Sequence, residues 1–174
     1  MKKGLLVIPS VILFCLVSGC EQQGTEPVEN SVVDIQAEKA EVQAILTQYG
    51  TALAAQDINL LSEIFSQDED IVMLDGNTSR RLIGWHEIKE RYQEHFAVLE
   101  KLDVTYRDLI IKIHDTGEAA WLACVFDWTL LNRGKKISTE GLRATWVLKK
   151  KNDAWKIAQL HFSFPKTKEE QPQE

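Results

Sequence analysis

His161 and Ser163, near the end of the chain, are residue types that enzymes use for acid–base and nucleophilic chemistry. They lie two positions apart in an extended segment, and side chains at that spacing share a face of a strand. His161 is a candidate general acid or base because the ordinary pKa of histidine lies near neutrality. A serine and a histidine form a triad only with an oriented acid, for which Asp127 is the candidate. The alternative is a buried His161 whose ring is satisfied by a backbone carbonyl or a neighbouring side chain.

Arg143 is the second candidate, because it interrupts an apolar strand that it shares with Thr145. A buried guanidinium needs a carboxylate or an anionic ligand beside it. Asp127 and Glu140 are possible partners within the chain, so both structural pairing and ligand contact remain open. We expect Arg143, Thr145 and Ser163 among the ligand-binding residues.

Strand alternation decides which side chains of the last strand can meet. It predicts that one face carries Trp155, Ile157, Gln159, His161 and Ser163, which alternate with Lys156, Ala158, Leu160, Phe162 and Phe164. Both faces contain large apolar residues. One of them should line a pocket and the other should pack against a partner, and the sequence leaves open which is which.

The 5 tryptophans could line an apolar ligand site, or they could belong to a core and a dimer interface. We place Trp85 and Tyr92 of one predicted helix among the ligand contacts. Cys124 lies in an apolar strand and is expected to be a small core residue rather than a nucleophile.

Metal-binding patterns are missing from the sequence. His86, Glu87 and His95 do not have the spacing of a zinc-protease helix. The acidic run that begins at Asp68 lacks the glycine and the spacing of a calcium loop, and reads as a solvated turn. We therefore predict neither a metal nor a cofactor.

The elements that must position these residues are helical first and extended afterwards. Apolar residues at helical spacing predict a long helix with Tyr49 on its buried face, a short helix capped by Asp57, and a third helix from about Trp85 to Leu99. Short strands are expected at 71–74 and 81–83, and long strands at about 103–114, 118–131, 136–150 and 155–164. This order predicts an α+β domain, with three helices on one face of a curved, mostly antiparallel sheet of about six strands.

The start of the chain is similar to a targeting signal. Lys2 and Lys3 precede a short apolar run that ends in Val17-Ser18-Gly19-Cys20, which resembles the lipobox of bacterial lipoproteins. The resemblance implies removal of residues 1–19, acylation of Cys20 and a domain held outside the cytoplasm on a bacterial membrane. Glu21 in place of an aspartate resembles the pattern for sorting to the outer membrane in cells with two membranes. Residues 20–36 then form a flexible tether, and residues 166–174 a loose polar tail.

Charge limits the partners of the expected mature protein. Loss of Lys2 and Lys3 leaves 18 basic residues against 26 acidic ones, a net charge of −8. Such a domain is a poor candidate for nucleic acid, and its attachment to a membrane must come from acyl chains. A small-molecule ligand remains possible.

Residues 37–165 resemble the SnoaL-like branch of the nuclear transport factor 2-like superfamily. The resemblance rests on Tyr49-Gly50-Thr51-Ala52-Leu53 with Asp57 and Ile64-Phe65, on Gly84-Trp85-His86-Glu87-Ile88, on the strand from Gly141 to Leu148, and on Trp155-Lys156-Ile157 followed by His161-Phe162-Ser163-Phe164-Pro165. It implies a cone-shaped fold with a pocket between the first helix and the sheet, and a homodimer formed through the sheet. The superfamily hosts isomerases, dehydratases and plain binding domains, so function depends on the site.

Tyr49 and Asp75 take their expected roles from this resemblance. Tyr49 matches the oxyanion-hole tyrosine of the ketosteroid isomerases in the superfamily, and Asp75 lies near the place of their base. Their third element, a protonated carboxylic acid, would fall near Ala144, where residues 142–148 hold no carboxylate. We therefore expect a pocket that binds a small molecule, with Tyr49 and Asp75 in its wall. The alternatives are an isomerase, dehydratase or small hydrolase that uses His161, and a dimerising interaction module without catalysis.

Overall fold

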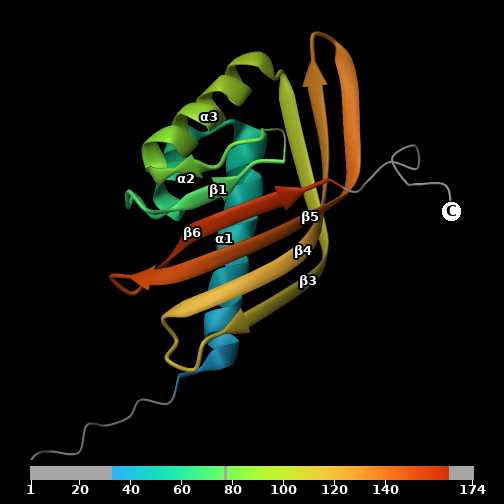
Figure 1. The fold of residues 1–174 in the computed structure, drawn as a ribbon. Coiled ribbons are helices and arrows are strands. Elements are labelled where there is room, and N and C mark those ends of the chain that lie inside the picture. The colour runs from blue at the N-terminus through green and yellow to red at the C-terminus, as the bar shows by residue number, and fades with distance from the viewer. Residues whose placement is uncertain (1–32, 77, 165–174) are drawn as a thin grey trace, which may run out of the picture. The chain divides into compact units, whose positions relative to one another are not determined.

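A computed structural model describes residues 33–76 and 78–164 of the chain. The predicted signal, Cys20 and the tail at 166–174 lie outside these residues. The elements follow one another as α1 (Ile35–Ala55), α2 (Ile58–Ile64), β1 (Val72–Leu74), β2 (Leu82–Ile83), α3 (Gly84–Val98), β3 (Lys101–Ile113), β4 (Ala119–Asn132), β5 (Lys135–Lys151) and β6 (Ala154–Ser163) (Figure 1). The expected order of three helices, two short strands and four long strands is confirmed.

Short polar side chains set where the first two helices begin. The Asp34 carboxylate accepts hydrogen bonds from the backbone N–H groups of Gln36 and Ala37 at 3.0 and 3.1 Å. Helix α1 therefore begins within the segment predicted as tether. Asp57 caps α2 in the same way, as the sequence predicts, with its carboxylate 2.8 Å from the backbone N of Asn59. Helix α1 ends where Gln56 takes the left-handed conformation, with a φ of 54°.

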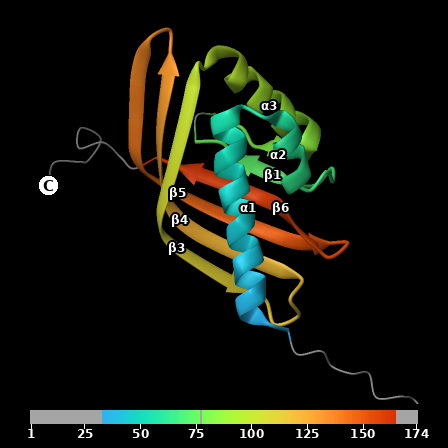
Figure 2. The ribbon, with the colours of Figure 1, turned by 180° about the vertical axis from the view of Figure 1, so that it is seen from behind.

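The six strands form one sheet in the order β2-β1-β6-β5-β4-β3. Neighbouring strands are antiparallel except for β1 and β6, which are parallel. The sheet is therefore mixed, with an antiparallel meander of long strands and two short strands added beside β6. Helix α1 runs along one face of this sheet (Figure 2), and we call that the inner face.

The core lies between the inner face and the helices. Buried residues from α1 and from the central strands meet there: Val42, Leu46, Tyr49, Leu122, Phe126, Leu142, Trp146, Leu148 and Leu160. Cys124 is buried among them, and burial raises the pKa of its thiol to about 11, so the expectation of a core cysteine is confirmed. The Trp155 indole N–H donates to the Glu38 carboxylate at 2.8 Å, which fastens the start of α1 to β6.

A bulge in β6 overturns the predicted alternation. Trp146 pairs with Leu160 and Leu148 pairs with Ile157, so one extra residue lies on the β6 side between these two pairs. Ile157 and Leu160 are therefore both on the inner face, at 0% exposure. The bulge reverses the faces, and His161 and Ser163 leave the face of Trp155 and Ile157 that was predicted for them.

The acidic run that begins at Asp68 forms an exposed turn at Glu69 and Asp70, as the sequence predicts, but Asp68 itself makes ion pairs. The Asp68 carboxylate lies 2.6 Å from the Lys149 ammonium and 2.5 Å from that of Lys151. These contacts and a hydrogen bond from Ser66 lower the pKa of Asp68 below its usual range. They hold the segment between α2 and β1 against the end of β5.

Candidate functional site

A narrow apolar cavity opens between α1, α3 and the inner face of the sheet. Its interior is about 70 Å³, and with its open mouth the void is about 580 Å³. The lining is mostly aliphatic and aromatic: Tyr49, Leu53, Met73, Asp75, Gly76, Tyr92, His95, Phe96, Leu102, Val104, Phe126, Trp128, Leu142, Phe162 and Phe164. An interior this small accepts a group of about the size of a single ring, while longer ligands would extend into the mouth.

Two tyrosine hydroxyls meet on the cavity wall. Tyr49 of α1 and Tyr92 of α3 are 2% and 3% exposed, and their hydroxyl oxygens lie 2.8 Å apart. Burial is the main cause that raises the pKa of each, so both remain protonated at ordinary pH. Only one of the two O–H groups can donate in their shared contact. The other can therefore donate to a different acceptor, such as an oxygen atom of a ligand.

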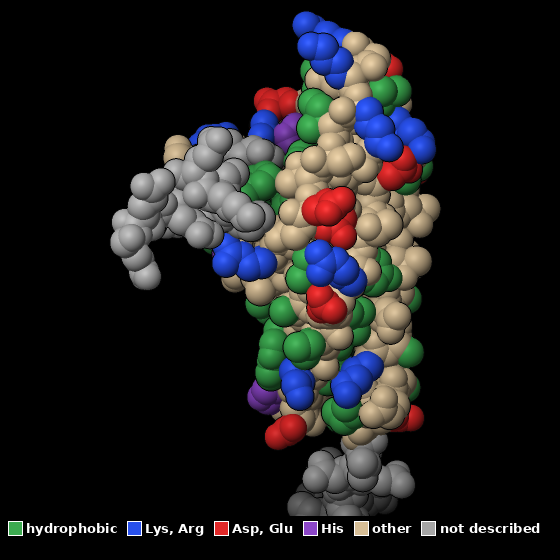
Figure 3. All heavy atoms as spheres, turned by 90° about the vertical axis from the view of Figure 1, so that its right-hand side faces the viewer, with side chains coloured by type: hydrophobic (Ala, Val, Ile, Leu, Met, Phe, Trp, Pro, Cys, Tyr) green, Lys and Arg blue, Asp and Glu red, His purple; other side chains and the backbone are tan. Residues whose placement is uncertain are grey.

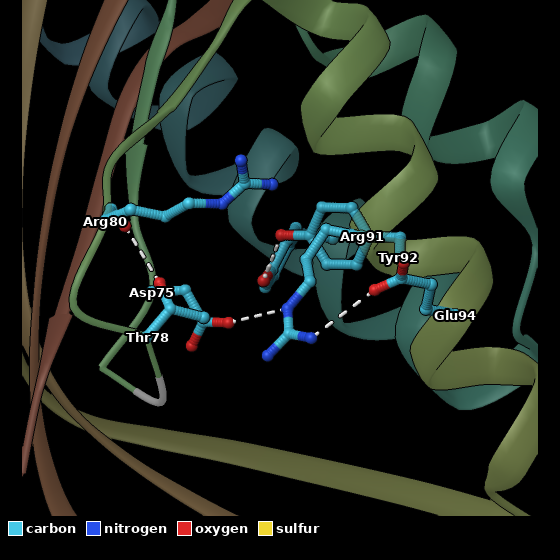
Figure 4. A network of polar contacts seen from close by, with 7 residues as sticks. Asp75, Thr78, Arg80, Arg91, Tyr92 and Glu94 are labelled. Atoms are coloured by element: carbon cyan, nitrogen blue, oxygen red, sulfur yellow. Dashed lines mark hydrogen bonds and ion pairs between the residues drawn. The ribbon is translucent and has the colours of Figure 1, made fainter.

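A carboxylate that is paired with an arginine lies beside the tyrosines. Asp75 follows β1 and is 6% exposed, and its Oδ2 accepts from Nε of Arg91 at 2.9 Å (Figure 4). Arg91 also reaches Glu94, with Nη1 3.5 Å from Oε2. A turn holds Asp75 in place, since the Thr78 N–H donates to its carbonyl oxygen at 3.1 Å. The ion pair compensates the buried negative charge, so this end of the cavity favours uncharged ligands.

His95 is a lining residue that the sequence analysis considered only as a metal ligand. It lies three positions after Tyr92, one turn further along α3, and a search for polar residues at helical spacing from Tyr92 would have found it. Burial lowers its pKa below the ordinary value, and the nearby Arg91 charge adds to this. The imidazole is therefore neutral at physiological pH and able to accept or donate a hydrogen bond.

The tryptophans are divided between different surroundings. Trp128 lines the cavity, and its buried indole N–H has no hydrogen-bond partner among the residues that the structure describes. Trp85, predicted as a ligand contact, is not part of the lining. It stacks instead on Phe65, with ring centroids 5.2 Å apart. The half-exposed Trp85 therefore packs α3 against the end of α2.

The predicted acid–base set lies on the opposite, outer face of the sheet. His161 pairs with Thr145, and Ser163 pairs with Arg143, in adjacent rows of the ladder between β5 and β6. Arg143 is exposed, and its guanidinium donates to the Phe164 carbonyl at 3.2 Å rather than to Asp127 or Glu140. None of these four residues lines the cavity, because the β6 bulge turns His161 and Ser163 away from it.

Asp127 has a structural position instead of a place beside His161. Its Oδ1 accepts the Gly141 backbone N–H at 2.7 Å, and its Oδ2 lies 3.3 Å from Nε of Arg107. The register of β4 and β5 shifts at this point, between Phe126 and Trp128. Asp127 therefore satisfies the N–H that the irregularity leaves without a strand partner. The triad of His161, Ser163 and Asp127 is not assembled.

Within the described ranges, the structure contains no cluster of three or more histidine, cysteine, aspartate or glutamate side chains that could hold a metal ion. No helix of residues 33–76 or 78–164 combines the length and the apolar character needed to cross a bilayer. The polar groups that line the cavity are tyrosine hydroxyls, the His95 imidazole, the Trp128 indole and the Asp75 carboxylate, in an otherwise apolar wall.

Comparisons with known proteins agree with this architecture. The model of the SnoaL-like domain family matches residues 42–167. A nuclear transport factor 2 (NTF2-like) superfamily protein from Salmonella enterica serovar Typhimurium superposes with a TM-score of 0.69 at 21% identity, over 76% of this chain and 94% of that chain. A putative dehydratase of the NTF2-like family from Streptomyces avermitilis gives a TM-score of 0.67 at 18% identity, over 75% and 97% of the two chains.

A putative scytalone dehydratase from Novosphingobium aromaticivorans is more distant, with a TM-score of 0.63 at 12% identity, over 73% of this chain and 83% of that chain. No curated protein matches the chain. At these identities the structural likeness establishes the fold and leaves the chemistry to the residues of this cavity.

Proposed function

The chain belongs to the family of SnoaL-like domains, and from that premise we propose that it binds a small, uncharged and largely apolar molecule in the cavity between α1, α3 and the sheet. The observation that carries the proposal is the Tyr49–Tyr92 hydroxyl pair, which supplies an O–H donor in an otherwise apolar wall. The ligand would therefore present one acceptor oxygen, a carbonyl or a hydroxyl, on a ring-sized apolar body. In this proposal the helices and the curved sheet form the cone-shaped container that the family resemblance implies.

The polar groups around the tyrosines support an uncharged ligand. The negative charge of Asp75 is compensated by Arg91, and the lowered pKa of His95 keeps its ring neutral. A carboxylate ligand would meet the Asp75 charge, and an ammonium ligand would meet Arg91, in a setting where water screens weakly. A neutral oxygen acceptor avoids both repulsions and gains the tyrosine O–H.

A pair of matched probes tests this proposal. Cyclohexanone and methylcyclohexane have similar size, but only the ketone has an acceptor oxygen. We expect cyclohexanone to raise the melting temperature of the protein more than methylcyclohexane does, and the double variant Tyr49→Phe, Tyr92→Phe to remove the difference, because either hydroxyl alone still offers an O–H donor. Tyr106→Phe is the control, because Tyr106 is half-exposed on β3 and its hydroxyl lies 3.4 Å from that of Thr47, away from the tyrosine pair. Equal effects of the two probes on the unmodified protein would contradict the proposal.

We propose further that acyl chains on Cys20 hold the domain on the outer side of a bacterial membrane, the outer membrane where the cell has two. The support is the lipobox-like Val17-Ser18-Gly19-Cys20 after a short apolar run. Stable attachment needs more than one acyl chain, so Cys20→Ser should release the protein from the membrane fraction. Labelling with a palmitate analogue checks this directly. Equal labelling of the Cys20 variant and the unmodified chain would contradict the proposal.

The outer face of the sheet favours association of two copies. Ile110, Trp121 and Val147 are 59%, 50% and 38% exposed, and Trp121 and Val147 are directly paired neighbours on β4 and β5. Large apolar side chains in adjacent rows form a patch of the kind that protein interfaces use. We propose a homodimer through this face. Light scattering should show a dimer that Trp121→Asp converts to a monomer, and a monomeric unmodified protein at micromolar concentration would count against it.

A further inference from the structure

The outer edge of the β4–β5 hairpin is a feature that ligand binding leaves unexplained. β5 pairs with β4 from Lys135 to Lys149, but it pairs with β6 only from Arg143 onward. Residues 135–142 of β5 therefore have no strand on their second side within the part of the chain that the structure describes. Figure 1 shows this stretch at the outer edge of the hairpin, beyond the point where β6 ends. Unpaired backbone groups on such an edge are a template for another strand.

The hairpin turn determines which residues direct their backbone groups to this edge. Arg133 and Gly134 have φ values of 49° and 71°, and they join Asn132 to its partner Lys135 as a two-residue loop. The pair that flanks such a loop is hydrogen-bonded, and the direction of the N–H and C=O groups alternates along the strand. Lys135 and every second residue after it therefore direct these groups to β4. The residues that direct theirs to the free edge are Lys136, Ser138 and Glu140.

We propose that this edge pairs with the same edge of a second copy, in an antiparallel register whose two-fold axis passes at Ser138. In this register Lys136 of each copy lies opposite Glu140 of the other, and Ile137 lies opposite Thr139. The contact is symmetric, as the interfaces of most homodimers are. It joins the six-stranded sheet of one copy to that of the next. The proposal does not depend on ligand binding in the cavity.

Charge complementarity selects a second copy and this register. Lys136 and Glu140 are both exposed, and neither has an ion-pair partner among the described residues. The symmetry produces two Lys136–Glu140 pairs in one contact, and directly opposed unlike charges stabilise antiparallel strands. The register centred on Ile137 leaves both charges without an unlike neighbour. The register centred on Lys136 places two lysines opposite each other, which is unfavourable.

The same register covers part of an exposed apolar side chain. Ile137 is 50% exposed and lies on the face of β5 opposite to that of Ser138. Pairing places Thr139 of the second copy beside it, and two Ile137–Thr139 pairs form in each contact. Branched side chains of this kind pack well against neighbours on a pleated surface. The contact therefore reduces the exposed apolar surface of the hairpin.

Gly141 sets the length of the contact. Its φ is 77°, and the register between β4 and β5 shifts beside it. Its N–H donates to Asp127 on the β4 side at 2.7 Å, which agrees with the alternation counted from the turn. A strand bends at such an irregularity, so a straight partner pairs only with the residues before it. The proposed pairs all lie between Lys136 and Glu140 and do not cross it.

The surface around the edge is charged in the way that this contact requires. Figure 3 faces the side of the molecule on which the edge lies, and basic side chains gather at the hairpin tip, where Arg133, Lys135 and Lys136 are exposed. Acidic side chains lie lower on the same side. An antiparallel contact brings the basic end of each edge to Glu140 at the other end of its partner.

The contact is small, since each strand contributes five residues from Lys136 to Glu140. Interfaces of small area are weak and transient, so we expect this one at higher protein concentration than the dimer through the outer face. It uses a surface separate from Trp121 and Val147. A second self-complementary surface links dimers into larger assemblies.

Zero-length cross-linking tests the register. Trp121→Asp removes the outer-face contact, and the full chain with this change is kept in detergent at roughly 0.5 mM, where weak contacts are populated. A carbodiimide joins a lysine to a carboxylate only where the two touch. We expect a Lys136–Glu140 link between copies, shown by mass spectrometry on a mixture of unlabelled and isotope-labelled chains. Lys135 is the matched control, because it falls opposite Gly141 and should form no link to Glu140.

Charge exchange tests the pairing by a second route. Lys136→Glu places like charges opposite each other twice in each contact, and so does Glu140→Lys, so each variant alone should self-associate roughly tenfold or more weakly. An equal mixture of the two variants restores two unlike pairs between unlike copies, and should associate as the unmodified edge does. Sedimentation velocity on the Trp121→Asp background measures this. Lys135→Glu is the control variant and should weaken association less than about twofold.

Three results would overturn the proposal. One is a mixture of the two charge variants that associates no better than either variant alone. Another is the absence of the Lys136–Glu140 link in a protein whose thermal unfolding is unchanged. The third is slow hydrogen exchange of the Lys136, Ser138 and Glu140 amides that is the same at low and high protein concentration, because it would assign the edge to the chain's own C-terminal segment.

Discussion

The two faces of the central strands use similar residues for different purposes. Trp146 on the inner face is 1% exposed and packs its ring against Tyr49 with centroids 4.7 Å apart, whereas Trp121 on the neighbouring strand is 50% exposed on the outer face. The same contrast holds for polar groups, since Tyr49, Tyr92 and His95 border the cavity while His161 and Arg143 lie on the outer face. Residue type alone therefore does not separate a ligand site from an interface, and the face on which a residue lies does.

The largest expected effect comes from the tryptophan pair. Trp146→Ala should lower the free energy of unfolding by about 3–5 kcal/mol, because it removes a buried ring and leaves a cavity. Trp121→Ala should cost the monomer less than about 1 kcal/mol, because half of that side chain is already exposed. Denaturant unfolding of both variants at low protein concentration makes the comparison. Similar losses in the two would mean that the outer face is packed as tightly as the inner one.

The second-largest loss of stability is expected at Asp127, a polar residue of the outer face whose side chain bonds the backbone of β5. Asp127→Ala leaves the Gly141 N–H without its acceptor and should lower the free energy of unfolding by about 1–3 kcal/mol. Asp127→Asn retains a side-chain carbonyl in that place and should cost less. Urea unfolding of the two variants separates a hydrogen bond from a charge effect, and a loss that is equal in both would assign the contribution to the ion pair with Arg107.

The fold followed from the sequence because its signals are periodic and local. Tyr49 and Leu53 at helical spacing and the cap at Asp57 each specify an element without reference to the rest of the chain. The order of these elements then left few arrangements open. Tyr49, Asp75 and Tyr92 lie together at the cavity for this reason, while their part in binding stays a prediction.

The placement of His161 failed because one residue changes a strand's faces. Alternation from Trp155 assumes an unbroken period of two, and a single bulge reverses every side chain that follows it. The β6 bulge follows from pairing between strands, with Ile157 opposite Leu148 and Leu160 opposite Trp146. Nothing in the local pattern marks that position. His95 was missed for a different reason. It was compared only with the metal-ligand spacing of His86 and Glu87, and not with its position one turn from Tyr92.

On the inner face, Tyr92→Phe should lower the free energy of unfolding by a moderate amount. It removes one hydroxyl of the 2.8 Å pair and leaves the buried Tyr49 hydroxyl without its partner. We expect a loss of about 1 kcal/mol in the free energy of unfolding, measured by chemical denaturation without ligand. The half-exposed Tyr106 again provides the control, and Tyr106→Phe should change stability by less than about 0.5 kcal/mol. A Tyr92→Phe protein as stable as the unmodified one would show that water replaces the lost hydroxyl.

The smallest effect concerns His95 and is seen only as a dependence on pH. Its pKa is lowered in the folded protein, mainly by burial, so the unfolded chain binds more protons than the folded one just below the ordinary histidine pKa of about 6.5. Stability should therefore rise with pH across that window and fall as the medium is acidified from 6.5 towards the folded-state pKa. His95→Gln should flatten this part of the stability profile, while His161→Gln on the outer face serves as the comparison. Parallel profiles for the unmodified protein and His95→Gln between pH 5 and 7 would mean that the cavity wall near Tyr92 is open enough for water to solvate the charged ring.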